Sequence, residues 1–336
     1  MGKACTLVHR NPDMFLVAVP DHQYGSGSTN CYIVRAGDET LVVDAGAASE
    51  EGARVLQAAL REVGARPETT SFFLTHLHVD HSGLLPAVAH EGALVRAGAA
   101  ELAVMRMLRD AAVREECGCR LQEDGVSKGE AGEYLAFRLG VDDVQDDRWS
   151  LCAVEGGDCV RVGDVEFAVL DTAGHAPGHC SLLHRESGVL IGGDQVLFTT
   201  SPYVPFYPGV EDRLALYLDR LSAVRKEGVV RLLQAHGRLR EEQDAFDGRV
   251  EWLISHRERR LREYRETVER TPGLTGVEIT LSSPSSANIG DWDACSMIVR
   301  WCVVSNGMAV LDHLLAVGQV AATVGADGVR RYLPAR

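Results

Sequence analysis

The segment Thr75-His76-Leu77-His78-Val79-Asp80-His81 constrains the fold of this chain more than any other feature. Its four metal-binding side chains, His76, His78, Asp80 and His81, directly follow the apolar run Ser71–Leu74, which favours a strand. Side chains one residue apart can share a face at a strand end, so His76 and His78 can bind one ion while Asp80 and His81 turn toward a second. The cluster predicts a metal site at the end of a strand.

Further metal-binding side chains follow three later apolar runs. His175 lies in a Gly- and Pro-containing turn after Val165–Leu170, Asp194 follows Val189–Ile191, and His236 follows Val229–Leu233. The cluster at 76–81 does not complete two coordination shells by itself, and these residues supply the missing ligands. The sequence therefore predicts a site for two metal ions.

The order of these motifs resembles that of the metallo-β-lactamase-fold hydrolases, including the glyoxalase II-like thioesterases. The motifs are His-X-His-X-Asp-His, then Gly-His-X-X-Gly-His at 174–179, then Gly193-Asp194, then His236-Gly237. The resemblance covers roughly residues 12–240. It implies an α/β fold, an αββα sandwich with helices outside two sheets.

The resemblance also implies how the ligands divide between the two ions. One ion would be bound by His76, His78 and His175, the other by Asp80, His81 and His236, and Asp194 would bridge both. Asp44 matches an aspartate that supports the ligands, and His179 would support its turn. Two turns depart from the family pattern: Ala173 replaces a usual proline, and Gln234-Ala235 replaces Pro-Gly. Neither change removes a ligand, but both alter the local turn.

Such a site can generate its own nucleophile. Two ions about 3.5–4 Å apart share a water molecule and lower its pKa toward neutrality, which gives hydroxide at pH 7. Asp80 and Asp194 are the carboxylates available to relay the proton. Histidine and aspartate ligands suit two divalent zinc ions best, although mixed nitrogen and oxygen sites also accept iron or manganese.

The segment Phe198–Tyr207, which is rich in aromatic residues and proline, follows Asp194 and could line the mouth of the site. Within it, Tyr203 and Tyr207 are candidate catalytic residues, because a tyrosine can donate a hydrogen bond to an oxyanion. Ordinary packing under a proline-rigid loop is the alternative interpretation.

We expect two parts in the chain: a catalytic domain, residues 1–240, and a mostly helical module, residues 241–336. A charge-mixed helical insertion at about 92–149 would act as a lid or as a dimer surface. The module contains a long Arg/Glu helix at 248–270, a helix at 308–317 and a small hairpin at 320–333. It resembles the winged-helix-like appendage of a subset of these hydrolases, but its alternating charges favour a solvated helix face over DNA binding.

Composition limits the partners. The net charge of −14, from 34 Lys+Arg and 48 Asp+Glu, disfavours nucleic acid. No apolar run approaches a membrane span, and no secretory signal pattern is evident. Nine cysteines without framework spacing fit a reducing cytosol. The expected protein is cytoplasmic and acts on a small molecule, with neither nucleic acid nor membrane as partner, and homodimerisation is left open.

The resemblance implies a metal-dependent hydrolase of a small ester-like substrate, with a thioester such as an acyl-CoA or acyl-glutathione conjugate favoured. A lactonase is the alternative among enzymes, and a nuclease of the same fold conflicts with the negative charge. A β-lactamase is disfavoured without a secretion signal. A non-enzymatic ligand-binding or regulatory protein is the alternative from another class, and the complete ligand set argues against it.

Overall fold

The structure is a computed structural model that describes residues 3–22, 27–138, 147–240, 245–286 and 291–335. The chain forms two compact units. The first consists of Met1–Ala103, Gly140–Pro202 and Arg220–Val250, and the second of Val104–Leu139, Tyr203–Asp219 and Glu251–Arg336.

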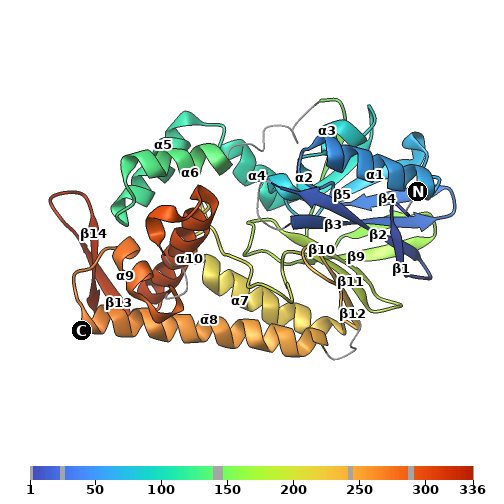
Figure 1. The fold of residues 1–336 in the computed structure, drawn as a ribbon. Helices are drawn as coiled ribbons and strands as arrows, with labels where there is room; N and C mark the ends of the chain where they lie inside the picture. The colour runs from blue at the N-terminus through green and yellow to red at the C-terminus, as the bar shows by residue number, and fades with distance from the viewer. Residues whose placement is uncertain (1–2, 23–26, 139–146, 241–244, 287–290, 336) are drawn as a thin grey trace. The chain divides into compact units, whose positions relative to one another are not determined.

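A seven-stranded mixed sheet forms one layer of the first unit (Figure 1). Its strands lie side by side in sequence order: β1 Thr6–His9, β2 Asp13–Asp21, β3 Gly27–Ala36, β4 Glu39–Val43, β5 Thr70–Leu74, β6 Leu94–Gly98 and β7 Ser150–Val154. The strands from β1 to β4 pair antiparallel, whereas those from β4 to β7 pair parallel. Parallel neighbours end at the same sheet edge, so the residues that follow β4 and β5 lie close together.

A five-stranded sheet forms the second layer of this unit. Its spatial order is β12-β11-β10-β9-β8, with bounds β8 Cys159–Val162, β9 Val165–Asp171, β10 Cys180–His184, β11 Val189–Gly193 and β12 Arg231–Gln234. The pair β11 and β12 is parallel, and the other pairs are antiparallel.

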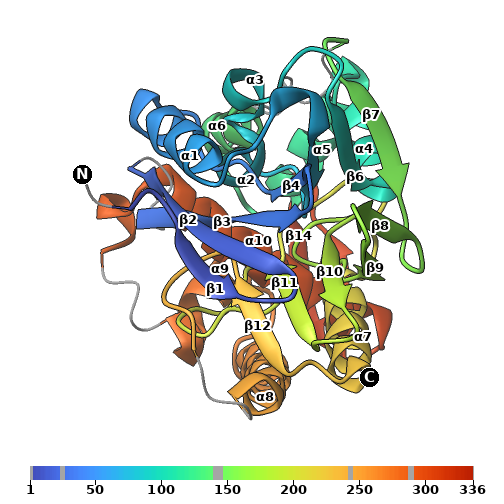
Figure 2. The same cartoon turned by 90° about the vertical axis from the view of Figure 1, so that its right-hand side faces the viewer.

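Apolar side chains from both sheets pack against each other between the layers. Val43 and Phe73 of the first sheet share one buried cluster with Phe167, Leu182 and Ile191 of the second. Burial of each such side chain contributes about 1.5–3 kcal/mol, so this core holds the sheets face to face. The helices α1 (Glu50–Glu62), α2 (Val79–Ser82) and α3 (Leu85–Val88) lie on the outer side of the seven-stranded sheet (Figure 2). The predicted α/β sandwich is confirmed.

The remaining helices belong to the second unit or begin or end in it. They are α4 Ala99–Met107, α5 Ala111–Glu123, α6 Lys128–Arg138, α7 Arg213–Val224, α8 Ala245–Arg270, α9 Gly276–Ser282 and α10 Met297–Ala316. Short 3-10 turns occur at Pro67–Thr69, Arg225–Glu227, Pro284–Ser286 and Trp292–Ala294. A hairpin of β13 (Val320–Val324) and β14 (Arg330–Pro334) follows α10, as the sequence predicted.

Helices of the insertion and of the C-terminal part share one core in the second unit. The rings of Tyr134 on α6 and Trp301 on α10 have centroids 5.4 Å apart. The hydroxyl of Tyr332 on β14 donates to the buried carboxylate of Asp124, at 2.7 Å. The second unit is therefore assembled from three stretches of chain rather than from residues 241–336 alone.

The insertion also differs from the expected one in its extent. Residues 94–98 form strand β6, which pairs parallel with β5 and β7, so the helical part begins only at α4. The short run Ala93–Ala97 is apolar except for Arg96, and burial of Ala93, Val95 and Ala97 explains it. Residues 139–146 of the insertion lie outside the described residues.

Helix α10 begins at Met297, well before the expected start near 308. It is the one helix among the described residues that is long and apolar enough to cross a membrane, and half of its apolar window is buried. Trp301, Val304 and Met308 on this helix pack in the core of the second unit. A core helix passes the same length and composition test, so this feature is weak evidence for a membrane span.

Candidate metal centre

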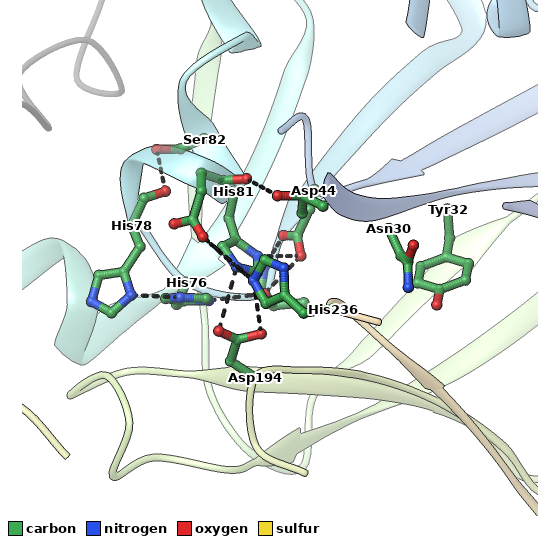
Figure 3. A network of polar contacts seen from close by, with 12 residues as sticks. Asn30, Tyr32, Asp44, His76, His78, His81, Ser82, Asp194 and His236 are labelled. Atoms are coloured by element: carbon green, nitrogen blue, oxygen red, sulfur yellow. Dashed lines mark hydrogen bonds and ion pairs between the residues drawn. The ribbon is translucent and has the colours of Figure 1, made fainter. Parts of the chain in front are cut away.

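Metal-binding side chains meet where strands of both sheets end (Figure 3). The structure brings together all the side chains that the sequence proposed as ligands, and all of them lie in the first unit. They are His76 and His78 after β5, Asp80 and His81 in α2, His175 between β9 and β10, Asp194 after β11 and His236 after β12.

The imidazole nitrogens form two groups. In the first group, His78 Nδ1 lies 2.9 Å from His76 Nε2 and 3.1 Å from His175 Nε2. In the second group, His236 Nε2 lies 3.3 Å from His81 Nε2 and 3.4 Å from Asp80 Oδ2. These groups are the ones that the family resemblance implied for the two ions.

Asp194 lies between the two groups. Its Oδ2 is 3.5 Å from His175 Nε2 and 3.7 Å from His81 Nε2, and its Oδ1 is 3.4 Å from His236 Nε2. In Figure 3 its carboxylate faces His81 and His236 from the strand beneath them. One carboxylate thus reaches both groups, as a bridging ligand must.

The donor atoms fit a pair of metal ions. Four ligands around a tetrahedral ion with bonds of 2.0–2.1 Å lie about 3.3 Å apart, close to the nitrogen and oxygen separations found here. The buried Oδ1 of Asp194 lies 3.4 Å from His236 Nε2 but accepts no hydrogen bond from the described residues, so its lone pairs can bind a cation between them. Histidine and aspartate groups in this arrangement are consistent with a dinuclear metal site.

For three histidines, the hydrogen-bond partner of Nδ1 determines which ring nitrogen carries the proton. His81 Nδ1 lies 2.9 Å from Asp44 Oδ2, and His236 Nδ1 lies 3.0 Å from the carbonyl oxygen of Ser28. Both partners accept hydrogen bonds, so Nδ1 carries the proton and the Nε2 lone pair points into the site. His76 Nδ1 contacts Thr75 Oγ1 at 3.1 Å, and that hydroxyl in turn donates to Asp44 Oδ2.

Burial and neighbouring charges set the protonation of the site. Burial lowers the pKa of His76 well below its usual range, so this ring is neutral. Burial opposes the charge of His81, but surrounding carboxylates, Asp44 foremost, raise its pKa to about 10. Burial likewise opposes ionisation of Asp194, yet His236 and His81 hold the pKa of its carboxyl well below the usual value. The ionised carboxylates therefore favour a cation at this position, either a protonated imidazole or a metal ion.

His179 lies outside the groups and holds Asp194 in place. Its Nε2 accepts a hydrogen bond from the backbone nitrogen of Asp194 at 3.1 Å, and its Nδ1 lies 2.7 Å from Thr172 Oγ1. Burial lowers the pKa of His179 to about 3, so the ring stays neutral and Nε2 keeps the lone pair that this contact needs. This is the supporting position that the family resemblance implied for it.

Two residues that the sequence did not point to, Asn30 and Tyr32, hold the loop that carries His236. Asn30 Nδ2 donates to the carbonyl oxygens of Gln234 and Gly237, at 3.1 and 2.8 Å, and Tyr32 Oη donates to that of Gln234 at 2.6 Å. Both side chains come from β3, beside the histidine loop (Figure 3). An asparagine directly before the apolar run Cys31–Val34 was the signal that could have drawn attention to this contact.

The two candidate catalytic tyrosines belong to the second unit. Tyr203 packs against the cluster of Tyr134, Trp301 and Met308. Tyr207 is buried and lines a cavity of about 660 Å³ within that unit. Their catalytic role stays a prediction.

Asp44 offers a direct test of the tautomer argument. It has φ 60°, a left-handed conformation that asparagine also tolerates, so Asp44→Asn preserves the backbone. The new amide would donate toward His81 Nδ1, which favours the tautomer with the proton on Nε2, the atom that faces the site. We expect metal affinity to fall by about 10–100-fold, measured by competition with a chromophoric chelator. Asp38→Asn, in the exposed turn before β4, is the matched control; equal affinities in both variants would contradict the argument.

Comparison with known proteins identifies the family. Residues 24–236 match the model of the metallo-beta-lactamase superfamily, which is more than half of the chain. The chain belongs to this superfamily. The crystal structure of a beta-lactamase domain protein from Burkholderia ambifaria aligns with a TM-score of 0.81 and 21% identity, over 99% of this chain and 95% of that one. This likeness shows that the fold is shared over nearly the whole chain.

Two curated relatives are similar over part of their length. The probable metallo-hydrolase YqjP of Bacillus subtilis is 28% identical over 56% of this chain and 59% of its own. The acyl-coenzyme A thioesterase MBLAC2 of Gallus gallus is 31% identical over 53% of this chain and 61% of its own. The matched region thus spans less than two thirds of either relative.

Proposed function

We propose that this protein hydrolyses thioesters of the acyl-CoA or acyl-glutathione class with the help of two divalent metal ions. The position of Asp194, within 3.5 Å of His175 in one group and 3.4 Å of His236 in the other, is the observation that carries the hydrolytic part of this proposal. The thioester part is supported by the similarity to an acyl-coenzyme A thioesterase. Zinc suits these ligands best, and iron or manganese are the alternatives.

When bound, two such ions supply an activated water nucleophile and polarise the carbonyl that it attacks. The protein contributes the geometry of the donors. The first group presents three imidazoles, and Asp194 reaches both groups, whereas Asp80 faces the second group. The donors therefore differ in charge between the groups: an ion held by the first group would keep more of its positive charge and would be the stronger Lewis acid of the two.

Asp80 and Asp194 divide the proton chemistry in this proposal. Asp194 is held through its backbone nitrogen by His179, and its side chain is 9% exposed. The side chain of Asp80 is 18% exposed and lies 3.4 Å from His236 Nε2. The better access of Asp80 to solvent makes it the carboxylate that can pass a proton from the attacking water to bulk solvent or to the leaving group.

We also propose a small-molecule substrate and a cytoplasmic location. The net charge of −14 opposes binding of a nucleic-acid backbone, which argues against a nuclease.

A substrate panel tests the proposal. One metal-loaded preparation is assayed against acyl-CoA and acyl-glutathione thioesters, lactones and phosphodiesters, with the chelator-treated protein as control. We expect the highest kcat/KM on a thioester and no cleavage of RNA at physiological salt. A higher kcat/KM on a lactone would replace the thioesterase by a lactonase. Tightly bound metal without turnover of any substrate would favour the non-enzymatic interpretation.

A further inference from the structure

A buried carboxylate that no motif marks lies beside the metal centre. Glu101 is in the first turn of α4, directly after β6, and is 1% exposed. Its Oε1 accepts a hydrogen bond from the backbone nitrogen of Leu77 at 3.2 Å, and its Oε2 accepts one from the backbone nitrogen of Gly178 at 2.9 Å. One side chain thus connects two segments that are distant in sequence.

These two segments carry the first group of imidazoles. Leu77 lies between His76 and His78 after a strand of the seven-stranded sheet, and Gly178 closes the turn that holds His175 in the five-stranded sheet. The separation between His175 Nε2 and His78 Nδ1, 3.1 Å, therefore depends on how the two segments are held together. Glu101 holds both, beside the backbone hydrogen bond from Cys180 N to Thr75 O.

The backbone around Glu101 is shaped to allow this approach. A Cβ atom on Gly178 would lie 2.2 Å from the backbone nitrogen of Glu101, and one on Gly98 would lie 1.9 Å from the carbonyl oxygen of Gly178. Neither contact is sterically allowed, so any side chain at either position would push the His175 turn away from α4. The close contact of this turn with Glu101 therefore requires glycine at both positions.

We infer that Glu101 is a positioning residue that sets the geometry of the His76, His78 and His175 metal site by fixing both of its loops. The inference rests on the metal centre described above but not on the substrate proposed for it. A carboxylate is suited to this role because both of its ends accept hydrogen bonds. Glutamine has nearly the same shape, but one end is an NH₂ group, which would face a backbone N–H and leave that buried donor without an acceptor.

The test is a stepwise metal titration of Glu101→Gln, with cobalt(II) and its visible absorption spectrum as the probe. His175→Ala and His236→Ala identify which binding step belongs to which group. We expect Glu101→Gln to weaken the step lost in His175→Ala by about 10–100-fold and to change its spectrum, while the other step keeps the wild-type affinity. Glu91→Gln, the same substitution at an exposed position before β6, should behave as the wild type.

Two results would overturn the inference. One is equal weakening of both steps, or loss of secondary structure in the metal-free variant by circular dichroism, because Glu101 would then support the fold as a whole. The other is wild-type affinity and spectrum at both steps. Failure of the thioester proposal would appear in the substrate panel alone and would leave the cobalt titration unaffected.

Discussion

Asp194→Asn is expected to lower kcat/KM for thioester hydrolysis by about 1,000-fold and to reduce the metal content of the purified protein. The substitution is nearly isosteric, so the core around β11 should be retained. It replaces one buried carboxylate oxygen by an NH₂ group, which cannot bind a cation and would face the imidazoles of one group. A 1,000-fold fall in kcat/KM corresponds to a loss of about 4 kcal/mol of transition-state stabilisation. Bound metal ions contribute several kcal/mol to transition-state stabilisation.

Steady-state kinetics and elemental analysis of the same preparation measure both effects. Asp164→Asn, in the exposed turn between β8 and β9 of the same sheet, is the matched control and should retain full activity. If Asp194→Asn kept two metal ions per chain and activity within tenfold of the wild type, Asp194 would not be a bridging ligand.

The ligands were predictable because each lies within a few residues of the end of a strand. His76 and His78 directly follow β5, Asp194 follows β11 and His236 follows β12, so a strand pattern and a metal-binding side chain could be seen in one short segment. The sandwich was predictable for the same reason. Short apolar runs separated by turns indicate strands, and the structure places them in two sheets around a shared core.

Residues that act across long sequence distances were not predictable. Glu101 contacts Leu77 and Gly178, and Asn30 contacts the loop at Gln234, through backbone groups that carry no sequence signature. A buried polar residue in an apolar segment shows that a partner exists, but its identity depends on the tertiary fold.

For a related reason, the sequence did not predict which stretches of chain form the second unit. The apolar face of α6 indicates burial, but not that Trp301, far along the chain, would cover Tyr134. The insertion and the C-terminal module therefore looked like separate appendages, whereas they form one unit. Strand β6 was missed because its short apolar run stands next to helical sequence, where periodicity does not separate the two.

His76→Ala should affect the metal centre more broadly than loss of His78, His175 or His236. The possible ligands form three overlapping sets of three side chains, and His76 belongs to two of them, with His78 and His175 in one and with His81 and Asp194 in another. His81 is the other histidine that belongs to two sets. Burial keeps its ring neutral, so its Nε2 lone pair is available without loss of a proton. We expect the variant to lose the ion of the first group and at least about 1,000-fold in kcat/KM.

Thermal unfolding with and without zinc tests the predicted loss of metal binding and needs no activity assay. A ligand present at 100 times its Kd stabilises the folded state by about 2.7 kcal/mol, so zinc should raise the Tm of the wild type clearly and that of His76→Ala much less. His22→Ala is the matched control, because His22 is exposed and its ion pair is with Glu51, which is also exposed. An equal rise in Tm for His76→Ala and the wild type would show that metal binding does not depend on His76, and the assignment of the first group would then fail even if hydrolysis were observed.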